Sequence, residues 1–288
     1  MNTRLFIYRL KHLKGIGNKG LLRILKHYME NPEEEASLSS YIAYGGVQPR
    51  YREQFVLSYD EASKITNEAL LLFNQTYQMV TLLEEDYPRG LAEIYNPPIC
   101  LFYVGKIELL HQPVLGMVGA RDASPLGKKI LEDMIPALVK KEIVVASGLA
   151  RGNDTWAHQL TIKNQGNTVG VIGTGLDVNY PRENQRLQEY MMKHHLVISE
   201  YLLGTGPRSY HFPSRNRIIA GISKGVCVIE AKKRSGSLIT AQLALEEGRD
   251  VFAVPGHPFD TNSEGCLTLI QEGAKCTWKS ADILEEWD

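Results

Sequence analysis

The feature that most constrains the fold is a series of short, continuous apolar runs that begins near residue 113. Each run is short and rich in β-branched side chains: Val114–Val118, Ile143–Ala146, Thr168–Ile172, Leu196–Ile198, Val226–Ile229 and Val251–Val254. Segments of helical periodicity lie between them, as at Leu126–Lys141, Asp154–Gln165 and Ser237–Gly248. Strands that are apolar on both faces are typical of a parallel sheet covered by helices on both sides. The alternation therefore predicts an α/β fold with a doubly wound, Rossmann-like, mostly parallel sheet.

The first third of the chain has a different pattern. Apolar residues at helical spacing precede a turn at Gly15-Ile16-Gly17, and a second helical segment follows. Several basic residues come before the first acidic residue, Glu30: Arg4, Arg9, Lys11, Lys14, Lys19, Arg23 and Lys26. A helix, a Gly-x-Gly turn and a helix can present backbone N–H groups to a DNA phosphate, as a helix-hairpin-helix does. A small bundle for packing or protein contact explains the same pattern, because charged outer faces are common on helices.

These two patterns divide the chain into three parts. We expect an all-helical domain at residues 1–83 and the Rossmann-like domain at 113–288. Between them, prolines at 88, 97 and 98 interrupt regular structure, so we expect residues 84–112 to form a connector.

Composition narrows the functional classes. The 288 residues carry a formal net charge of -1, so binding to a polyanion must come from local patches. The four cysteines have no CxxC spacing, which favours reduced thiols over a zinc site or a disulfide framework. The N-terminus lacks the apolar core of a signal peptide, and no apolar stretch approaches the roughly 18 residues that span a bilayer. We therefore expect a cytoplasmic protein without membrane insertion.

Glycine-, serine- and arginine-rich loops follow the predicted strands, at the edge where a doubly wound sheet binds its ligands. Glycine lets the backbone approach a ligand, helix N-termini offer N–H groups, and arginine forms bidentate contacts with phosphate. We expect phosphate loops at Gly119, Ser147, Gly148, Gly173, Gly175, Ser235, Gly236 and Ser237. We expect further phosphate contacts from Arg121, Arg151, Arg215, Asn216 and Arg217. Arg215 and Arg217 have an alternative role as salt-bridged structural residues at a helix start.

Familiar cofactor and catalytic motifs do not match. Val178 stands where GxGxxG would place its third glycine, and there is no GxxxxGK[ST], so neither a dinucleotide nor a Walker-type ATP site is expected. GxSxG, HExxH and clustered carboxylates are also missing from the sequence. Asp154 and His158 share a helical face as candidate acid and base, but helix capping and packing against the sheet explain them as well. We expect no catalytic residue, no metal and no cofactor.

Taken in order, the loops resemble those of the DprA/Smf family of DNA-processing proteins. The resemblance is strong over residues 84–288, and it rests on VGARDASPLG, SGLARGNDTWAH, VIGTGLDVNYPRENQRL, SEYLLGTGP, FPSRNRIIAGIS and VIEAKKRSGSLITAQLALEEGRDVFAVPG. It is looser over the N-terminal helices, which in that family form a sterile-alpha-motif-like (SAM-like) or helix-hairpin-helix-like domain. The resemblance implies a non-enzymatic protein that binds and protects single-stranded DNA during natural transformation and loads the RecA recombinase onto it. It also implies a homodimer formed through the C-terminal part of the Rossmann-like domain.

The resemblance assigns roles to particular residues. Arg121 matches the arginine of the family's Gly-Ser-Arg element, and Arg182 lies in Tyr-Pro-Arg-Glu-Asn at a basic position implicated in DNA binding. Arg208 lies near another such position, with looser spacing. Ala120 replaces the usual serine and Asn153 the usual isoleucine of the motifs, which puts a hydroxyl donor and an apolar contact in doubt.

For the dimer, we expect apolar residues on a helix at residues 265–271 to form an exposed stripe. The residues are Cys266, Leu269 and Ile270. Burial of the same residues within the monomer is the alternative.

Two other functions remain open. One is a nucleotide-processing enzyme similar to the lysine-decarboxylase-like phosphoribohydrolases, although Ser235–Thr240 stands where those carry Pro-Gly-Gly-x-Gly-Thr. The other is a nucleotide-sensing module without affinity for DNA.

Overall fold

The computed structural model describes residues 2–34 and 37–287 and divides into two compact units. The helical unit contains the described residues up to Tyr87 together with Asn96–Phe102, and the sheet unit contains Pro88–Tyr95 and the described residues from Tyr103 onward. The expected connector at residues 84–112 thus contributes to both units. It holds elements of its own: α6 (Arg89–Ala92), β2 (Cys100–Gly105) and the 3-10 turn η2 (Ile107–His111).

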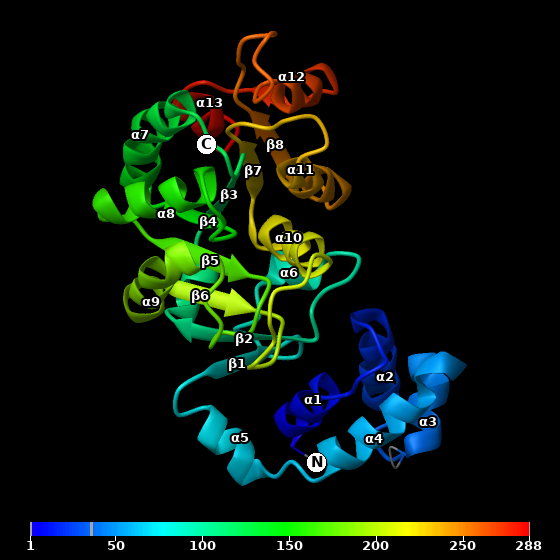
Figure 1. The fold of residues 1–288 in the computed structure, drawn as a ribbon. Coiled ribbons are helices and arrows are strands. Elements are labelled where there is room, and N and C mark those ends of the chain that lie inside the picture. Colours follow the sequence, from blue (N-terminus) through cyan, green and yellow to red (C-terminus); the bar gives the residue numbers. More distant parts are fainter. Residues whose placement is uncertain (1, 35–36, 288) are drawn as a thin grey trace. The chain divides into compact units, whose positions relative to one another are not determined.

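The helical unit is built from short helices (Figure 1). Its elements are α1 (Thr3–Lys11), α2 (Asn18–Glu30), α3 (Leu38–Gly45), the 3-10 turn η1 (Pro49–Tyr51), α4 (Arg52–Ser63), α5 (Asn67–Phe73) and β1 (Gln78–Thr81). Asn2 caps α1, because its side chain accepts from two backbone N–H groups of the first turn. Gly15 has a φ of 76° and turns the chain between α1 and α2, where the Gly-x-Gly turn was predicted.

The sheet unit has the predicted parallel sheet. Its strands are β3 (Val114–Val118), β4 (Val144–Ser147), β5 (Thr168–Ile172), β6 (Leu196–Ser199), β7 (Gly225–Val228), β8 (Asp250–Ala253) and β9 (Lys275–Cys276). They are hydrogen-bonded in the order β6-β5-β4-β3-β7-β8-β9, and each neighbouring pair is parallel. The α/β, doubly wound, Rossmann-like fold is confirmed, and the six predicted strands correspond to β3 through β8.

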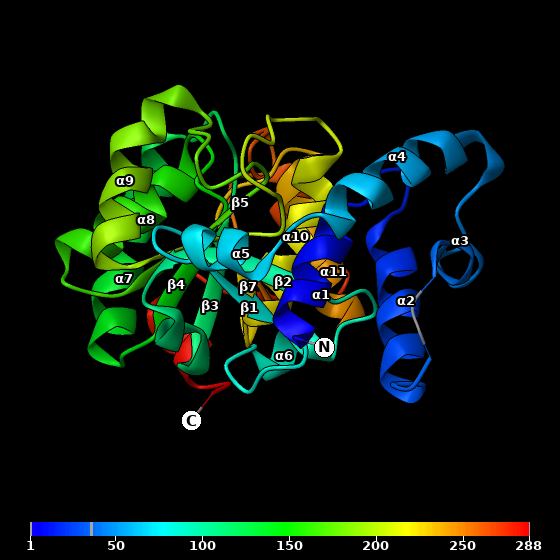
Figure 2. The ribbon, with the colours of Figure 1, turned by 90° about the horizontal axis from the view of Figure 1, so that it is seen from below.

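Helices cover both faces of this sheet. They are α7 (Pro125–Lys140), α8 (Asn153–Lys163), α9 (Gln185–His194), α10 (His211–Ile222), α11 (Gly236–Glu246), α12 (Glu264–Gln271) and α13 (Ser280–Leu284), with the 3-10 turn η3 (Arg182–Asn184) before α9. Figure 2 shows α7, α8 and α9 on one side of the sheet and α10 and α11 on the other. Within the described residues, none of the helices is both long enough and apolar enough to cross a lipid bilayer.

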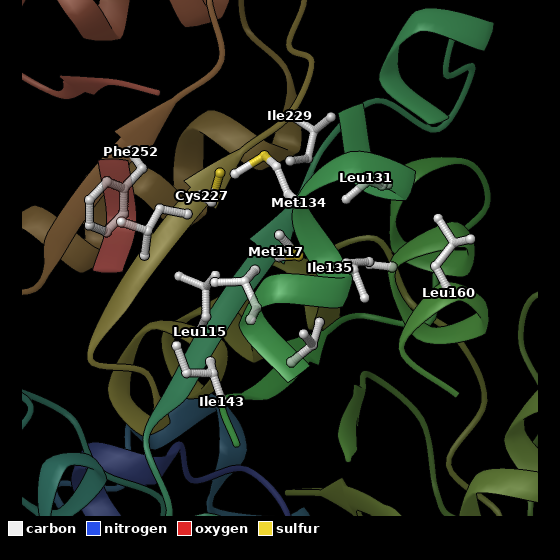
Figure 3. Packing of buried hydrophobic residues seen from close by; sticks show 14 of the residues in the cluster. Leu115, Met117, Leu131, Met134, Ile135, Ile143, Leu160, Cys227, Ile229 and Phe252 are labelled. Carbon is white, nitrogen blue, oxygen red and sulfur yellow. The ribbon is translucent and has the colours of Figure 1, made fainter. Parts of the chain in front are cut away.

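The main core lies between α7 and the sheet. Figure 3 shows Leu131, Met134 and Ile135 of α7 beside Leu115 and Met117 of β3, and all five side chains are buried. Each such side chain stabilises the fold by roughly 1.5–3 kcal/mol relative to an exposed one. This packing fixes β3, and with it the start of the loop that follows.

The sheet has its topological switch point between β3 and β7. From β3 the chain winds outward through β4, β5 and β6, and it returns to the other side of β3 with β7. Val118 and Val228, near the ends of the two strands, are register partners. The loops after β3 and β7 therefore start side by side and diverge to opposite faces, which opens a crevice at the carboxyl edge of the sheet.

Candidate nucleic-acid interface

A cavity of about 700 Å³ lies at this switch point. It is lined by residues from the loops after β3, β4, β5, β6 and β7 and by the start of α10 and α11. The charged and aromatic lining residues are Arg121, Asp122, Asp154, Tyr180, Arg208, Phe212, Arg215 and Lys232. A concave site with basic and aromatic groups at the switch point is suited to a phosphate-bearing ligand with a flat ring.

Arg121 and two aromatic rings form one wall of the crevice. The Arg121 side chain is exposed, and its Cζ lies 5.6 Å from the centre of the Phe212 ring. The Tyr180 ring is 5.5 Å from Phe212 with an interplanar angle of 33°. Tyr180 is 39% exposed and lines the cavity, so its ring can contact a planar ligand there. A guanidinium beside such a face can bind a phosphate while a base stacks on the ring.

The predicted Ser235-Gly236-Ser237 loop lies opposite, where it forms the start of α11 and lines the same cavity. The Ser235 and Ser237 hydroxyl oxygens are 2.7 Å apart and hydrogen-bonded. The first N–H groups of a helix lack acceptors within the helix, and they favour an anion. This arrangement suits a phosphate group, and Lys232 in the preceding loop adds an exposed positive charge.

The structure corrects the direct role that we expected for Arg217. Its Nη2 donates to both oxygens of Glu200, at 2.8 and 2.7 Å, and the two side chains are only 10% and 7% exposed. A buried, paired guanidinium is held in place because breaking the pair would leave a charge without a partner. Arg217 is the salt-bridged structural residue of the alternative interpretation.

Arg215 also supports the loops from within, although it reaches the cavity wall. It is 5% exposed, and Nη1 donates to the Gly148 carbonyl at 2.6 Å and to the Val171 carbonyl. Burial lowers the pKa of the Arg215 guanidinium to about 10, and the Asp154 carboxylate opposes that shift. Asn216 accepts from Arg215 Nε at 3.1 Å and donates to the Gly236 carbonyl at 3.2 Å, so it links α10 to the start of α11.

The remaining predicted arginines are exposed. Arg208 lines the cavity, and its Nη1 donates to the Tyr210 hydroxyl at 2.7 Å. Arg151 Nη1 is 3.9 Å from Glu183 Oε1, which places Arg151 beside the segment that carries Arg182. The structure thus places both Arg121 and Arg208 in the lining of the crevice, whereas Arg151 lies beside Glu183, the neighbour of the exposed Arg182.

Most of the predicted loop glycines make room for neighbouring protein groups. A Cβ at Gly119 would collide with the Asn153 side chain, one at Gly148 with the Arg215 guanidinium, and one at Gly175 with the Leu202 carbonyl. A Cβ at Gly173 would lie against the Phe212 ring. The Ser147 hydroxyl is buried and donates to the Met117 carbonyl at 2.6 Å. These residues therefore shape the loops, and Gly119 also lines the cavity, where its contact with phosphate stays a prediction.

The candidate acid and base of the α8 face are both buried, and Asp154 also lines the cavity. His158 is fully buried, and its Nδ1 is 2.6 Å from Thr168 Oγ1. Burial lowers the pKa of His158 to about 3. The Asp154 carboxylate accepts from the Gly148 and Ala150 N–H groups, and burial raises its pKa while Arg215 lowers it. Among the described residues, no group of three or more histidine, cysteine, aspartate or glutamate side chains could hold a metal ion.

The exposed stripe that we expected on α12 is wrong for two of its three residues. Cys266 is fully buried and Leu269 is 5% exposed, and Cys266 Sγ lies 3.6 Å from the Val228 carbonyl. Both pack inside the unit because α12 lies against β8. Ile270 is half-buried. The loop that leads into α12 carries Phe259, which is 92% exposed.

Known proteins resemble the chain closely. Residues 78–288 match the family described as DNA recombination-mediator protein A. The DNA processing protein DprA of Streptococcus pneumoniae is 45% identical over 287 residues, which is 99% of each chain. Its X-ray structure superimposes with a TM-score of 0.88 over 98% of this chain and 97% of that one. The DprA of Bacillus subtilis is 45% identical over 74% of this chain and 72% of its own length.

A more distant relative is DNA processing protein A from Helicobacter pylori, a structure that describes a single-stranded DNA binding mode. It is 27% identical with a TM-score of 0.66, and the match covers 73% of this chain and 95% of that one. The motif order, the family match and the near full-length identity agree. This chain belongs to the DNA recombination-mediator protein A (DprA/Smf) family.

Proposed function

We propose that this protein binds single-stranded DNA in the switch-point crevice, without catalysing a reaction on it. The observation that carries the proposal is the placement of Arg121 against the Phe212 and Tyr180 rings, opposite the serine-rich start of α11. Membership of a DNA-processing family supports it, as does the single-stranded DNA binding mode of the Helicobacter pylori relative.

The chemistry of the crevice favours a single strand over a duplex. Unpaired bases can leave their stack and lie on an aromatic side chain, which is worth about 1–3 kcal/mol per base. Phosphates on either side of such a base can reach Arg121 and the N–H groups of α11. Contacts of this kind are independent of sequence, and their affinity falls as salt concentration rises.

Fluorescence anisotropy with single and double strands of equal length tests the proposal. We expect the wild-type protein to prefer the single strand, and Arg121→Ala to weaken that binding about tenfold or more. Lys140→Ala is the matched control, because Lys140 is an exposed cation at the opposite end of α7 from the crevice. Equal, weak binding of both strands that is insensitive to Arg121→Ala would refute the proposal.

We propose further that the bound strand is passed to RecA during natural transformation and recombination in the cytoplasm, as the family resemblance implies. The test is the onset of RecA ATP hydrolysis on strands already coated with single-strand-binding protein. The wild-type protein should shorten the lag, and Arg121→Ala should not. An equal lag with and without the wild-type protein would mean that the protein does not load RecA, even if it binds single-stranded DNA.

We also propose a homodimer formed near α12. Because Leu269 is buried, a charge there would disturb the fold as well as an interface, so Ile270 and Phe259 are the better probes. Light scattering should give twice the chain mass for the wild type and the single-chain mass for Ile270→Arg combined with Phe259→Ser. An unchanged mass in that variant would place the interface elsewhere.

A further inference from the structure

Glu230 is a carboxylate buried at the switch point, directly after β7, and it is 8% exposed. Its Oε2 accepts from the Ser124 backbone N–H at 3.1 Å and from Asn153 Nδ2 at 3.0 Å. Its Oε1 accepts from the Ser124 hydroxyl at 2.5 Å. Each of these donors is an uncharged group. A carboxylate buried in this way needs such bonds, because losing any of them leaves the charge poorly solvated.

These three residues come from three different loops of the crevice. Ser124 ends the loop after β3, which carries Arg121. Asn153 begins α8 after the loop that follows β4, and its backbone N–H also donates to the Ala120 carbonyl at 3.2 Å. Glu230 opens the loop after β7, which leads through Lys232 to the start of α11. We call the three residues the loop junction.

Two glycines make space for the loop junction. A Cβ at Gly127 would collide with the Glu230 carboxylate, and a Cβ at Gly119 would collide with the Asn153 side chain. Asn153 Oδ1 is buried and has no hydrogen-bond partner among the described residues. Its amide is therefore oriented by the Glu230 contact alone.

We infer that Glu230 is a positioning residue for single-stranded DNA: through Ser124 and Asn153 it holds the loops of Arg121 and of the α11 start at the spacing that a strand requires. The role rests on the proposed function. Glu230 carries a negative charge beneath a site for phosphate. If Glu230 acted only by repelling phosphate, removing its charge would strengthen DNA binding. If Glu230 positions the loops, removing its charge should weaken DNA binding. The direction of the change in affinity therefore distinguishes the two roles.

Glu230→Gln is the central variant. It keeps the shape of the side chain, but its amide N–H₂ must replace the oxygen that faces Ser124, whose hydroxyl would have to turn from donor to acceptor although it already accepts from the Gly127 N–H. The contacts that remain at the amide oxygen also lose the charge of the carboxylate. We expect single-stranded DNA affinity to fall about tenfold, as is typical when a buried polar contact is lost. Ser124→Ala leaves the carboxylate and the backbone N–H contact in place, removes the hydroxyl donor, and also removes the N-cap of α7, because that hydroxyl accepts from the Gly127 N–H at 3.2 Å. It should lower the affinity about threefold.

Exchanging the acceptor at residue 230 and the donor at residue 153 provides a test of whether DNA affinity can be restored. Asn153→Asp alone places two carboxylates in contact, and it should weaken binding at least as much as Glu230→Gln. In the double variant, the glutamine amide donates to the new aspartate and the net charge of the pair is that of the wild type, while the Ser124 backbone N–H loses its acceptor. We expect the double variant to bind several-fold more tightly than Asn153→Asp, which a general loss of stability would not produce.

Thr161→Val is the matched control for stability. Thr161 is fully buried, and its hydroxyl donates to the Ala157 carbonyl at 2.7 Å; neither residue lines the crevice. It should lower the unfolding midpoint without changing the DNA affinity. The inference would be overturned if the Glu230→Gln variant bound single-stranded DNA as tightly as the wild type or more tightly. It would also be overturned if the double variant bound single-stranded DNA no more tightly than the weaker-binding single variant.

Amide hydrogen exchange of the free protein separates this inference from the proposed function. In Glu230→Gln, residues 119–124 and 229–235 should exchange faster, and in the double variant they should return toward the wild-type rate. If the wild-type protein does not bind single strands, the proposed function is wrong and the role in DNA binding falls with it. Exchange that is unchanged in Glu230→Gln would overturn the loop junction itself, whatever the DNA result.

Discussion

The two units both place basic residues near glycine turns, but they use them differently. In the helical unit, Arg4, Arg9 and Arg23 donate to backbone carbonyl groups of the same unit. In the sheet unit, Arg121 and Arg208 are exposed at the crevice. A basic, glycine-containing pattern therefore does not by itself indicate a phosphate site. What matters is whether the donors of each guanidinium already have protein acceptors.

The same distinction applies within the sheet unit. Arg215 lines the crevice and Arg217 lies two residues further on, yet both are buried and donate to protein carbonyl or carboxylate groups. They should govern the stability of the unit, whereas Arg121 should govern the affinity for DNA.

The largest effect should come from Arg217→Ala. It leaves the Glu200 carboxylate buried without its partner, which typically costs about 3–5 kcal/mol of unfolding free energy. Urea denaturation measures it. Arg121→Ala, in which an exposed arginine is removed, should change the same quantity by less than about 1 kcal/mol. Similar losses of unfolding free energy in the two variants would contradict the distinction between the buried, paired Arg217 and the exposed Arg121.

Acid should destabilise the protein through His158. The unfolded pKa is near 6.5 and the folded pKa is about 3, so the unfolded state binds the extra proton between these values. The stability is fully present above pH 6.5 and is lost as the pH falls. Linkage gives a loss of about 3 kcal/mol between pH 7.5 and pH 4.

Denaturation at several pH values measures this loss. His158→Gln should flatten the dependence, because glutamine does not titrate. His111→Gln is the control, since His111 is exposed in the same unit. A slope that is the same in His158→Gln and in the wild type would assign the acid sensitivity to other groups.

Phe212→Ala should lower single-stranded DNA affinity by about tenfold, because it removes a stacking surface worth about 1–3 kcal/mol per base. Comparing Phe212→Ala with Arg121→Ala distinguishes the contribution of base stacking to affinity from that of charge. Binding titrations over a range of salt should show an unchanged salt slope for Phe212→Ala. For Arg121→Ala, the slope should decrease by about 0.7, the value for one phosphate contact on a single strand. A reduced slope in Phe212→Ala would mean that the ring acts by orienting Arg121.

The smallest effect should come from the helical unit. Lys14 and Lys26 are exposed, and Lys26 pairs only loosely with Glu30 at 3.7 Å. If DNA binds in the crevice, Lys14→Ala with Lys26→Ala should change the affinity less than about twofold. A fall comparable to that of Arg121→Ala would revive the helix-hairpin-helix interpretation and break the comparison.

The sequence predicted the sheet unit well, because strands buried on both faces give continuous β-branched runs, as in Val114–Val118 and Thr168–Ile172. It missed β1 (Gln78–Thr81), which lies in the domain expected to be all-helical, and β9 (Lys275–Cys276), because strands of four and two residues carry little periodicity. It also missed β2 (Cys100–Gly105), an apolar run of six residues, because the neighbouring prolines led us to expect a connector there.

At the site, the sequence identified the loops but not the direction of each side chain. Arg121 and Arg217 look equivalent in sequence, and only the tertiary fold shows that Glu200 lies against one of them. The partners Ser124 and Glu230 are 106 residues apart, so no local motif could have joined them. The one available signal was Asn153, a polar residue where an apolar one was expected.

Gly236 offers a practical use of the crevice. It is the first residue of α11 and lines the cavity, and a Cβ built there meets no described atom within 4 Å. A cysteine at this position could carry a small fluorophore, since three of the four native cysteines are buried and Cys276 can be replaced by serine. The dye would sit where the strand arrives. Its brightness would then report the arrival and departure of unlabelled DNA in real time.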